Sequence, residues 1–534
     1  MISVQIPHER LNADYMSLSI KWWCRALAVT VSLSVNDARG QDARPDWASH
    51  PPISIHPENA KYFLFRNRPL VLITATEHYG SVLNRPFDFD KYLADAAEKR
   101  QTLTRTFMLF RELQTVRNPS SPCKPESPDY IAPWPRTGPG IALDGEPQFD
   151  VDQWNPEFFE RLHRFLTRAA ELGIVVELTL FSNAYTDRVW ALQPLNGENN
   201  LQRVGRVPFS QYTSLHDEAL LERQLAYVAK IVQETSRYDN VYYEICNEPG
   251  ACADTQTSAA DVDAWQARMA RAVRDELNKL DRKHLVFGCQ ANDDRPQFQK
   301  LDESFSGRTF DVVNVHPLPN TVLNGRAYGL GNFMSKELAL REFREFCHAT
   351  QAFGKPCVSD EDNTATLYRD DVGWTIHRKR AWTALLCQTH YDFIDFSVTV
   401  GNETGTTESN RKIRTWMKHL SEFIHAFDFI RAKPLEGWIE ECPPHLVASV
   451  LAIPGEDYAA YLADDREVTD PTAGKPISGN VSFQLPAGNY GASLYSPITG
   501  EASPAVRVQG GQQAVVVSLP PFVHDIVLRV VREH

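Results

Sequence analysis

The sequence lacks three features that would indicate other classes of protein. Its nine cysteines form no C-x-x-C pair and no zinc-like cluster, so no metal and no organic cofactor is implied. Outside the N-terminal region it has no uninterrupted run of about 18 apolar residues, and we expect no membrane span. Basic blocks are also missing. The formal charge is −13 and the acids are scattered, which argues against nucleic acid as a partner.

The length and composition indicate more than one globular domain. The chain has 534 residues, of which 43% are hydrophobic and 23% are charged. These proportions are typical of a folded protein, and a barrel of about 250 residues or more with a smaller module accounts for the length. Cys246, Cys289 and Cys357 fall in predicted strands, where we interpret them as buried thiols.

The N-terminal region resembles a secretory signal. Lys21 precedes the apolar stretch 22–35, and the small-residue sequence Ala38-Arg-Gly40 follows it. Met16 fits the start of such a signal better than Met1 does, although Arg25 interrupts the apolar stretch. We expect residues 1–40 to be an extension with a signal peptide and the protein to be secreted or periplasmic; the alternative is a disordered tail. The polar, proline-containing residues 41–60 are predicted to be a linker.

The middle of the chain alternates strand and helix patterns eight times. Such alternation in one continuous stretch predicts a parallel (β/α)8 TIM barrel, placed at residues 61–432. A proline-rich excursion, residues 111–155, interrupts it and suits a wall of a substrate cleft. The predicted strands are 70–76, 103–110, 174–181, 241–247, 284–289, 310–316, 355–361 and 391–397.

The C-terminal part of the sequence has a different pattern of apolar residues. Short apolar runs at 446–451, 457–462, 481–485, 491–495 and 513–518 are separated by Gly, Pro and Asn turns. This pattern predicts an all-β sandwich, residues 433–534, attached to the α/β barrel as an accessory domain.

The stretch 241–249, Val-Tyr-Tyr-Glu-Ile-Cys-Asn-Glu-Pro, contains the first candidate catalytic residue. Its aromatic and β-branched start predicts a buried strand, and Pro249 ends the strand directly after Glu248. A carboxylate at the C-terminal end of a barrel strand is a typical catalytic position. Hydrolysis of a glycosidic bond needs two carboxylates, so a second acid is required.

Glu361, at the end of the seventh predicted strand, is the best second acid. Because side chains alternate along a strand, Cys357, Ser359 and Glu361 are expected to share the inward face. Asp360 and Asp362 are then expected to be outer or loop residues. Acids on strands four and seven could approach to about 5–5.5 Å, the separation at which one attacks and the other exchanges protons.

Arg105 on the second strand is a candidate partner for the ionised acid. The alternative is a structural ion pair with Glu177 or Glu244 inside the barrel. Glu244, two and four residues from Cys246 and Glu248, is interpreted as a paired buried acid and not as a catalyst.

Together, Asn247-Glu248-Pro249, Glu361, Arg105 and His316 resemble the clan A glycoside hydrolases, nearest to the family 5 cellulase-like enzymes. The resemblance covers about residues 60–430. It implies that Glu248 is the acid/base and Glu361 the nucleophile of a retaining β-glycoside hydrolase that cleaves O-glycosidic bonds of a poly- or oligosaccharide. It also implies that Asn247 binds the sugar 2-hydroxyl. The alternatives are a transglycosylase with the same residues and a non-catalytic carbohydrate-binding protein on a barrel scaffold.

The sequence departs from the family pattern at three strand ends. Pro317-Leu318 follows His316 where the family has His-x-Tyr, Ser182-Asn183 occupies the place of a histidine, and Phe396-Ser397-Val398 replaces a tryptophan. Cellulose-type specificity therefore does not carry over. Further candidates for substrate binding, each with a packing or structural alternative, are Glu77, His78, His316, Asn183, Tyr185, Trp190 and Trp134.

Overall fold

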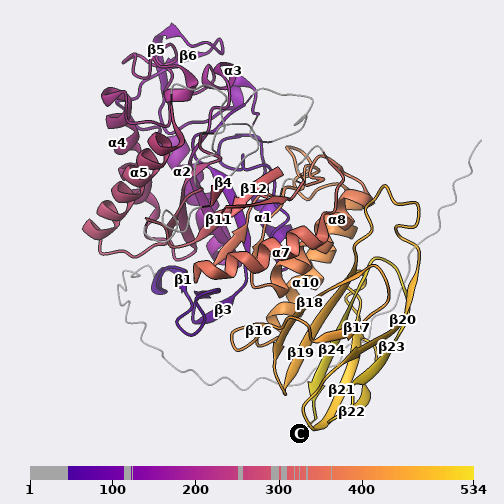
Figure 1. The fold of residues 1–534 in the computed structure, drawn as a ribbon. Coiled ribbons are helices and arrows are strands. Elements are labelled where there is room, and N and C mark those ends of the chain that lie inside the picture. Colours follow the sequence, from indigo (N-terminus) through magenta and orange to yellow (C-terminus); the bar gives the residue numbers. More distant parts are fainter. Residues whose placement is uncertain are drawn as a thin grey trace, which may run out of the picture. The chain divides into compact units, whose positions relative to one another are not determined.

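A computed structural model describes residues 46–533 apart from 113–121, 123, 251–256, 290–299, 302–308, 318, 324, 332–334 and 363 (Figure 1). These residues belong to one compact unit, Pro45–His534. The predicted extension and signal, residues 1–40, lie outside the described residues. Among the helices in the described ranges, none is long and apolar enough to cross a membrane.

Two parallel sheets form the centre of the strand–helix region. The first contains β4 (Leu103–Phe107), β7 (Val175–Ser182), β8 (Val241–Asn247) and β9 (Val286–Phe287) in that order. The second contains β11 (Val313–Val315), β14 (Cys357–Ser359) and β15 (His390–Tyr391). All neighbouring pairs within these sheets are parallel, so the C-terminal ends of each sheet's strands lie at one edge.

Single bridges connect the two sheets. Gly288 pairs with Val313, which links the end of β9 to β11. The first predicted strand forms only isolated parallel bridges, from Ile73 to Tyr391 and from Thr76 to Ile394. Its Ile73 carbonyl accepts a hydrogen bond from the Thr102 amide at 3.0 Å, next to β4. The eight predicted strand segments are thus present in chain order, within a mixed α/β architecture.

The helices begin and end where local sequence signals place them. α2 (Pro156–Leu172) has Asn155 as its N-cap, Pro156 in its first turn and left-handed Gly173 (φ 72°) at its end. Its apolar face, which includes Phe158, Leu162 and Phe165, is buried against the sheet region. The other helices of the region are α1 (Phe89–Glu98), α3 (Asp187–Trp190), α4 (Glu218–Thr235), α5 (Ala259–Lys279), α7 (Leu340–Thr350), α8 (Asp371–Leu386), α9 (Thr407–Ser409), the π-helix η5 (Asn410–Arg414) and α10 (Thr415–His425).

Residues 46–60 differ from the linker expected there. β1 (Ser54–Ile55) pairs with β2 (Phe63–Phe65), which forms a hairpin with β3 (Arg68–Leu70). Trp47, in the 3₁₀ turn η1 (Asp46–Ser49), stacks on Tyr238 with ring centroids 4.8 Å apart. This segment is therefore part of the packed fold, because its few apolar residues are enough to attach it.

Short elements lie inside connections that the sequence predicts as loops. The excursion 111–155 contains the 3₁₀ turn η2 (Ser127–Asp129) and a hairpin of β5 (Arg136–Ile141) and β6 (Pro147–Phe149). Proline and glycine in β5 concealed this strand pattern. The remaining short elements are η3 (Phe209–Gln211), β10 (Lys300–Leu301), β12 (Pro319–Leu323), β13 (Arg326–Gly329) and η4 (Gln351–Phe353).

The C-terminal part forms two antiparallel sheets that share one hydrophobic cluster, the arrangement expected of a sandwich. Val481 and Phe483 from the smaller sheet join Tyr458 and Leu528 from the larger one in this cluster. The larger sheet has the order β16 (Lys433–Pro434), β18 (Leu446–Ile453), β19 (Asp457–Asp464), β24 (Asp525–Arg532), β21 (Gly488–Tyr495), β22 (Val506–Gly510), and the smaller has β17 (Ile439–Glu441), β20 (Ile477–Phe483), β23 (Val515–Phe522).

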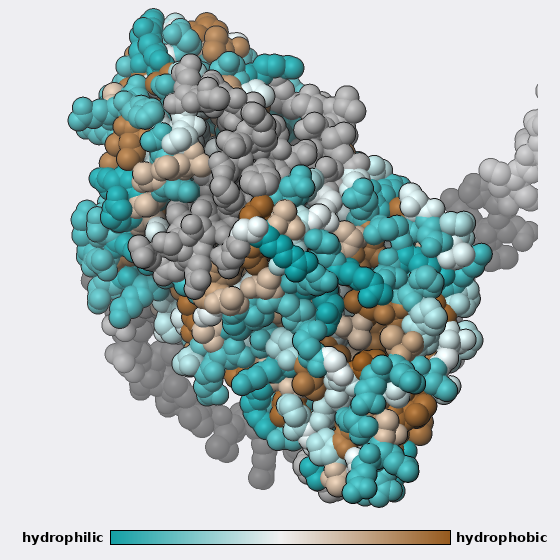
Figure 2. Space-filling model, viewed as in Figure 1, coloured by the Kyte–Doolittle hydropathy of each residue, from teal (hydrophilic) through white to brown (hydrophobic). Residues whose placement is uncertain are grey.

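The surface of these C-terminal sheets offers no aromatic platform for a sugar. Between residues 433 and 533, every Trp, Tyr and Phe is buried or half-buried, and the exposed large apolar side chains are aliphatic, such as Val506 and Val516. On the face drawn in Figure 2, hydrophilic side chains predominate, and the apolar ones lie between them in patches. The C-terminal part therefore contributes packing to the fold more clearly than it contributes a binding face.

Helix α8 ties the C-terminal sheets to the strand–helix region through buried charges. Arg378 donates to Asp525 of β24 at 2.8 Å, and the Tyr461 hydroxyl donates to the same carboxylate oxygen at 3.0 Å. Lys379 donates to the Asp464 carbonyl at 2.7 Å, and burial lowers its pKa to about 8. These contacts are almost fully buried, so each charge depends on its partner.

Replacing Asp525 with alanine is expected to destabilise the protein by about 3 kcal/mol, because Arg378 would keep its charge without a carboxylate. The shift of the guanidinium chloride unfolding midpoint, followed by tryptophan fluorescence, measures this. The exposed pair Arg431–Glu456 provides the control, and Glu456→Gln is expected to leave the midpoint unchanged. An equal effect of the two substitutions would contradict the assignment.

Candidate active site

Two glutamates at strand ends have strained backbones. Glu248 directly follows β8 and Glu361 lies two residues beyond β14. Their φ angles are 43° and 48°, in the left-handed region that side-chain-bearing residues rarely adopt. Such a conformation costs about 1–3 kcal/mol per residue and is concentrated at functional sites. The surrounding contacts must therefore hold both glutamates in place.

Arg105 is the buried cation of the site. From β4 its guanidinium reaches Glu361 Oε2 at 3.0 Å and Asn247 Oδ1 at 2.9 Å. It also contacts Glu177 at 2.8 Å and Glu244 at 2.6 Å. The sequence left two interpretations of Arg105 open, and the structure shows the contacts of both. Arg105 pairs with the interior acids Glu177 and Glu244, and it also donates to Glu361 beyond β14. Glu244 is a buried, paired acid, as predicted.

His316 bridges the two glutamates. Its Nδ1 lies 3.1 Å from Glu248 Oε1 and 3.6 Å from Glu361 Oε2. One ligand-type atom from each of these three residues lies within 4.8 Å of the others. The structure thus brings together Glu248, His316 and Glu361, the residues predicted at the ends of the strands now labelled β8, β11 and β14.

A second set of polar groups surrounds Glu248. The Tyr185 hydroxyl donates to Glu248 Oε2 at 2.7 Å, and Asn247 Nδ2 donates to the Tyr185 oxygen at 2.8 Å. Asn183 Nδ2 donates to the Glu248 carbonyl at 3.0 Å. Tyr185, a sequence candidate for substrate binding, is therefore hydrogen-bonded to the candidate acid/base.

The two glutamates have pKa values on opposite sides of the ordinary one. Burial raises the pKa of Glu361 to about 8; the charge of Glu248 adds to this, while His316 and Arg105 oppose it. Burial also acts to raise the pKa of Glu248, but the hydrogen bond and charge of His316, with Tyr185 and Arg105, outweigh it and lower that pKa. The pair therefore holds one proton between them near neutral pH.

The position of Asp360 corrects the expectation from strand alternation. Asp360 is fully buried inside, with Oδ2 at 3.4 Å from Arg105 and 2.8 Å from Asn314. Cys357 belongs to the hydrophobic cluster that contains Phe343 and Phe346 of α7, on the outer side. The inward face is thus the opposite of the one predicted. Glu361 reaches the site because its left-handed backbone breaks the alternation.

Asp362 lies on the outer side, as expected for it. Its carboxylate pairs with Arg380 of α8 at 2.5 Å. It lies in the connection between β14 and α8, and its side chain is fully buried there.

Glu77 and His78 lie buried next to the site. The Glu77 carboxylate accepts hydrogen bonds from the Gly80 amide at 2.8 Å and from the Ser81 hydroxyl at 2.6 Å. Burial raises its pKa to about 7 against these bonds. His78 packs against Tyr79 and Phe396, and burial lowers its pKa to about 3. Glu77 thus closes a turn, and His78 is a neutral ring beside the residue that replaces the family's tryptophan.

Trp134 and Trp190 lie in the packing of their own loops, the alternative that the sequence left open. Trp134 stacks on Trp154 and contacts Tyr227, and Trp190 packs against Tyr212 and donates to the Val207 carbonyl. Both indoles are almost fully buried. The described contacts of these two side chains do not include the glutamate pair.

Two cationic side chains of the protein lie among the carboxylates of the cluster. Glu177, Glu244 and Asp360 bring carboxylate oxygens within 4.8 Å of one another, but the Arg105 guanidinium lies among them. The pKa of His316 is raised well above its ordinary value: burial opposes this, but Cys289, Asp360 and Glu248 favour the charged ring. Arg105 and His316 are thus the cations of this site.

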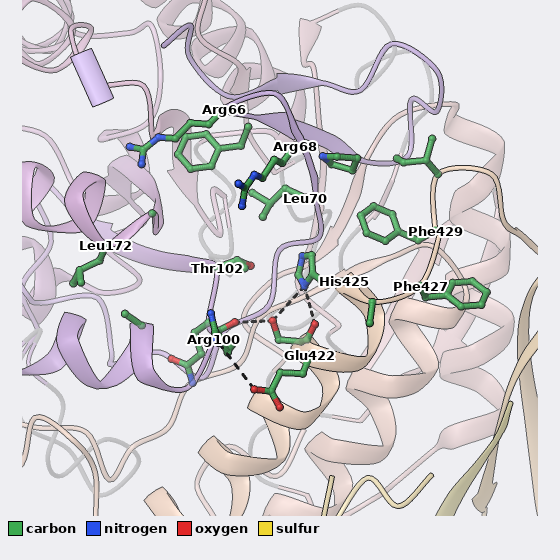
Figure 3. Close-up of a pocket in the computed structure, with 18 of the residues that line it drawn as sticks. Arg66, Arg68, Leu70, Arg100, Thr102, Leu172, Glu422, His425, Phe427 and Phe429 are labelled. Atoms are coloured by element: carbon green, nitrogen blue, oxygen red, sulfur yellow. Dashed lines mark hydrogen bonds and ion pairs between the residues drawn. The ribbon is translucent and has the colours of Figure 1, made fainter. Parts of the chain in front are cut away.

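A large pocket lies at the other end of the strands. Its volume is about 1080 Å³ (Figure 3). It is lined by Leu70, at the start of the first strand segment, and by Thr102 and Gly173, which precede β4 and β7. Arg66 at its rim pairs with Asp239 at 2.6 Å, and Arg100 faces Glu422 at 4.0 Å. The C-terminal ends of α1, α2 and α10 meet here, and cations are favoured at helix C-termini. Arg66 and Arg100 therefore have structural partners, and the two candidate glutamates lie at the opposite strand ends.

Comparison with solved structures identifies the fold. No family model and no curated protein matches the sequence. A glycoside hydrolase family 5 structure from Bacteroides vulgatus ATCC 8482 matches with a TM-score of 0.58 at 12% identity, covering 90% of this chain and 93% of that one. A structure described as a glycoside hydrolase matches with a TM-score of 0.56 at 12% identity, covering 90% and 97%. The resemblance to family 5 is thus confirmed as a likeness of fold.

Proposed function

We propose that this protein is a retaining β-glycoside hydrolase that acts on O-glycosidic bonds of a poly- or oligosaccharide. The observation that carries the proposal is the glutamate pair at the ends of β8 and β14, with His316 between the two carboxylates. One oxygen of each carboxylate lies within 4.8 Å of the other. This proximity suits a double displacement better than an inverting reaction, in which the carboxyl groups are about 6.5–9.5 Å apart. The family 5 fold supports the same reaction class.

In the first step, a Glu361 oxygen attacks the anomeric carbon while the glycosidic C–O bond breaks and the leaving oxygen takes the proton of Glu248. In the second step, Glu248 accepts a proton from water, whose oxygen attacks the same carbon and releases Glu361. Arg105 donates to Glu361 and favours its departure as a carboxylate. Asn247, held by Arg105, lies beside Glu248 at the place proposed for the sugar 2-hydroxyl.

The mechanism requires the shared proton to be on Glu248. In the free protein the raised pKa of Glu361 and the lowered pKa of Glu248 favour the other carboxylate. A bound glycosidic oxygen accepts a hydrogen bond from protonated Glu248 but offers none to Glu361. Substrate binding therefore favours the reactive arrangement, and the pH profile reports two macroscopic pKa values of the pair.

The wider architecture belongs to the same proposal. We infer that the eight parallel segments close into a (β/α)8 barrel, with the C-terminal sheets forming a β-sandwich on α8. Export to the periplasm or the medium is proposed from the apolar stretch 22–35. A carbohydrate substrate outside the cell fits such a location.

The proposal predicts a covalent intermediate. Incubation with a panel of 2,4-dinitrophenyl 2-deoxy-2-fluoro-β-glycosides is expected to add the mass of one fluoroglycosyl group to the intact protein. The fluorine slows both steps, while the good leaving group lets the first proceed. Peptide mapping is expected to place the group on Glu361.

Two variants provide the controls. Glu361→Gln is expected to gain no mass, whereas Glu77→Gln, which changes a nearby buried acid without a proposed role in bond cleavage, is expected to be labelled on Glu361. Labelling of another carboxylate would contradict the role of Glu361. Natural oligosaccharides that bind but are never cleaved would favour the carbohydrate-binding alternative.

A further inference from the structure

We propose that Tyr185 is a positioning residue that holds Glu248 through its hydroxyl and favours the ionised carboxylate. This inference rests on the proposed function, because it concerns the acid/base of the same reaction. The tyrosine comes from the connection after β7, a place where the family pattern has a histidine and this sequence has Ser182-Asn183.

The direction of the hydrogen bonds follows from one fixed amide. Arg105 can only donate, so the Asn247 atom that it contacts at 2.9 Å is the carbonyl oxygen. Asn247 Nδ2 then donates to the Tyr185 oxygen at 2.8 Å. Tyr185 must direct its own hydrogen elsewhere, and Glu248 Oε2 lies at 2.7 Å. The chain Arg105, Asn247, Tyr185, Glu248 is therefore oriented towards the carboxylate.

Asn183 fixes the backbone of both members of the pair. Its side-chain oxygen accepts from the Tyr185 amide at 3.0 Å, and its amide nitrogen donates to the Glu248 carbonyl at 3.0 Å. Tyr185 (φ 58°) and Glu248 (φ 43°) are both left-handed. Two residues with strained backbones thus bond to the same asparagine side chain, and such strain is concentrated at functional sites. Asn183 thereby fixes the Tyr185 hydroxyl and the Glu248 carboxylate relative to each other.

The two carboxylate oxygens of Glu248 therefore have different partners. Oε2 is occupied by Tyr185, and Oε1 faces His316 at 3.1 Å. The charged groups around Glu248 are His316, Glu361 and, one residue further, Arg105. Tyr185 adds a neutral donor to this set, and a donor to a carboxylate favours its ionised form. It therefore supports the base that activates water in the second step.

Tyr185→Phe is the test. Phenylalanine keeps the ring that packs edge-on against Phe110 and removes only the hydroxyl. The pKa of Glu248 is expected to rise by about one unit, the size expected when a hydrogen bond to a charged group is lost. The measurement is a ¹³C-carboxyl NMR titration of glutamate-labelled full-length protein, with the Glu248 signal assigned by its absence in Glu248→Gln.

Kinetics provide the second readout. With 2,4-dinitrophenyl β-glycosides, whose leaving group needs no proton, the second step limits kcat. The ascending limb of the kcat–pH profile is expected to move upwards by the same amount as the NMR pKa. A purely structural loss would lower kcat at all pH values without moving the limb.

The control is Tyr238→Phe, which deletes a hydroxyl hydrogen-bonded to His163 and Thr167 away from the site. It is expected to leave the pKa of Glu248 unchanged. Asn247→Ser keeps Tyr185 but removes the donor that orients it, and a smaller shift in the same direction is expected. It also provides a test should Tyr185→Phe not fold.

The outcomes separate the two proposals. An unshifted Glu248 pKa in both Tyr185→Phe and Asn247→Ser overturns the role of Tyr185, even where the fluoroglycoside labels Glu361. A shifted pKa in a protein that the fluoroglycosides do not label supports the role of Tyr185 and counts against the proposed hydrolysis.

Discussion

Glu361→Ala is expected to lower kcat by about 10⁴-fold or more, because the proposed glycosyl ester forms on the carboxylate that this substitution removes. Azide is expected to restore part of the turnover by entering the space left by the side chain. It then attacks the anomeric carbon from the side on which the Glu361 carboxylate lies in the wild type, so the product is the α-glycosyl azide. Initial rates and ¹H NMR of the product measure both results.

The Glu248 variant must behave differently. Glu248→Ala is expected to lower kcat by about 10²–10⁴-fold on substrates with poor leaving groups, the usual size of general acid catalysis. Azide then attacks the glycosyl ester in the second step, and the product is the β-glycosyl azide. The same azide anomer from both variants would contradict the assignment of the two roles, and inversion in the wild-type reaction would exclude a double displacement.

The motif Asn247-Glu248-Pro249 at the end of β8 was predictable because its signals are local. The β-branched and aromatic run predicts the strand, and Pro249 marks its end, so Glu248 falls at a strand tip from sequence alone. The same holds for α2, where Asn155, Pro156 and Gly173 give both boundaries.

Glu361 was identified by an argument whose premise is wrong. Alternation counted from Cys357 assumes a regular strand through residue 361, but β14 ends at Ser359 and Glu361 has a left-handed backbone. Asp360 therefore occupies the interior position, beside Arg105. No sequence signal gives a positive φ at a glutamate, because that conformation is imposed by tertiary contacts.

The role of an aromatic residue could not be predicted for a similar reason. Tyr185, Trp190 and Trp134 all occur in long connections, and by sequence alone they are equally good candidates for substrate binding. The structure separates them by contacts: Tyr185 bonds to Glu248, while the two tryptophans are buried in their loops. The Tyr185–Glu248 contact joins residues 63 positions apart, which local sequence pattern does not encode.

Arg105 is the residue on which the charge balance of the interior depends. It is fully buried and contacts Glu177, Glu244, Asp360 and Glu361. Asp360 shows the effect: burial acts to raise its pKa, but Arg105 and His316 hold the pKa well below its usual range. Without the guanidinium, several carboxyls in a water-poor interior would repel one another.

Arg105→Met is therefore expected to lower the free energy of unfolding by about 3–5 kcal/mol at pH 7, the cost of removing one partner of a buried ion pair. It is also expected to lower kcat, because Glu361 loses its donor at 3.0 Å. Guanidinium chloride unfolding measures the first effect. The control is Arg85→Met, whose half-exposed pair with Glu157 at 2.7 Å is expected to contribute about 1 kcal/mol or less.

The pH dependence of the free energy of unfolding shows whether Arg105 acts through its charge. In the wild type, a carboxyl with a depressed pKa such as Asp360 adds stability above its unfolded pKa, and this is lost as the pH falls towards the folded value. Glu361, whose pKa is raised, already adds stability to the wild type as the pH falls below about 8. In Arg105→Met, Asp360 and the other interior carboxyls are expected to have higher pKa values than in the wild type, so the stability of the variant increases more steeply as the pH falls from 7 towards 5. The stability gap between the two proteins is expected to narrow over this range. A gap that stays constant with pH would mean that Arg105 acts by packing and not by charge.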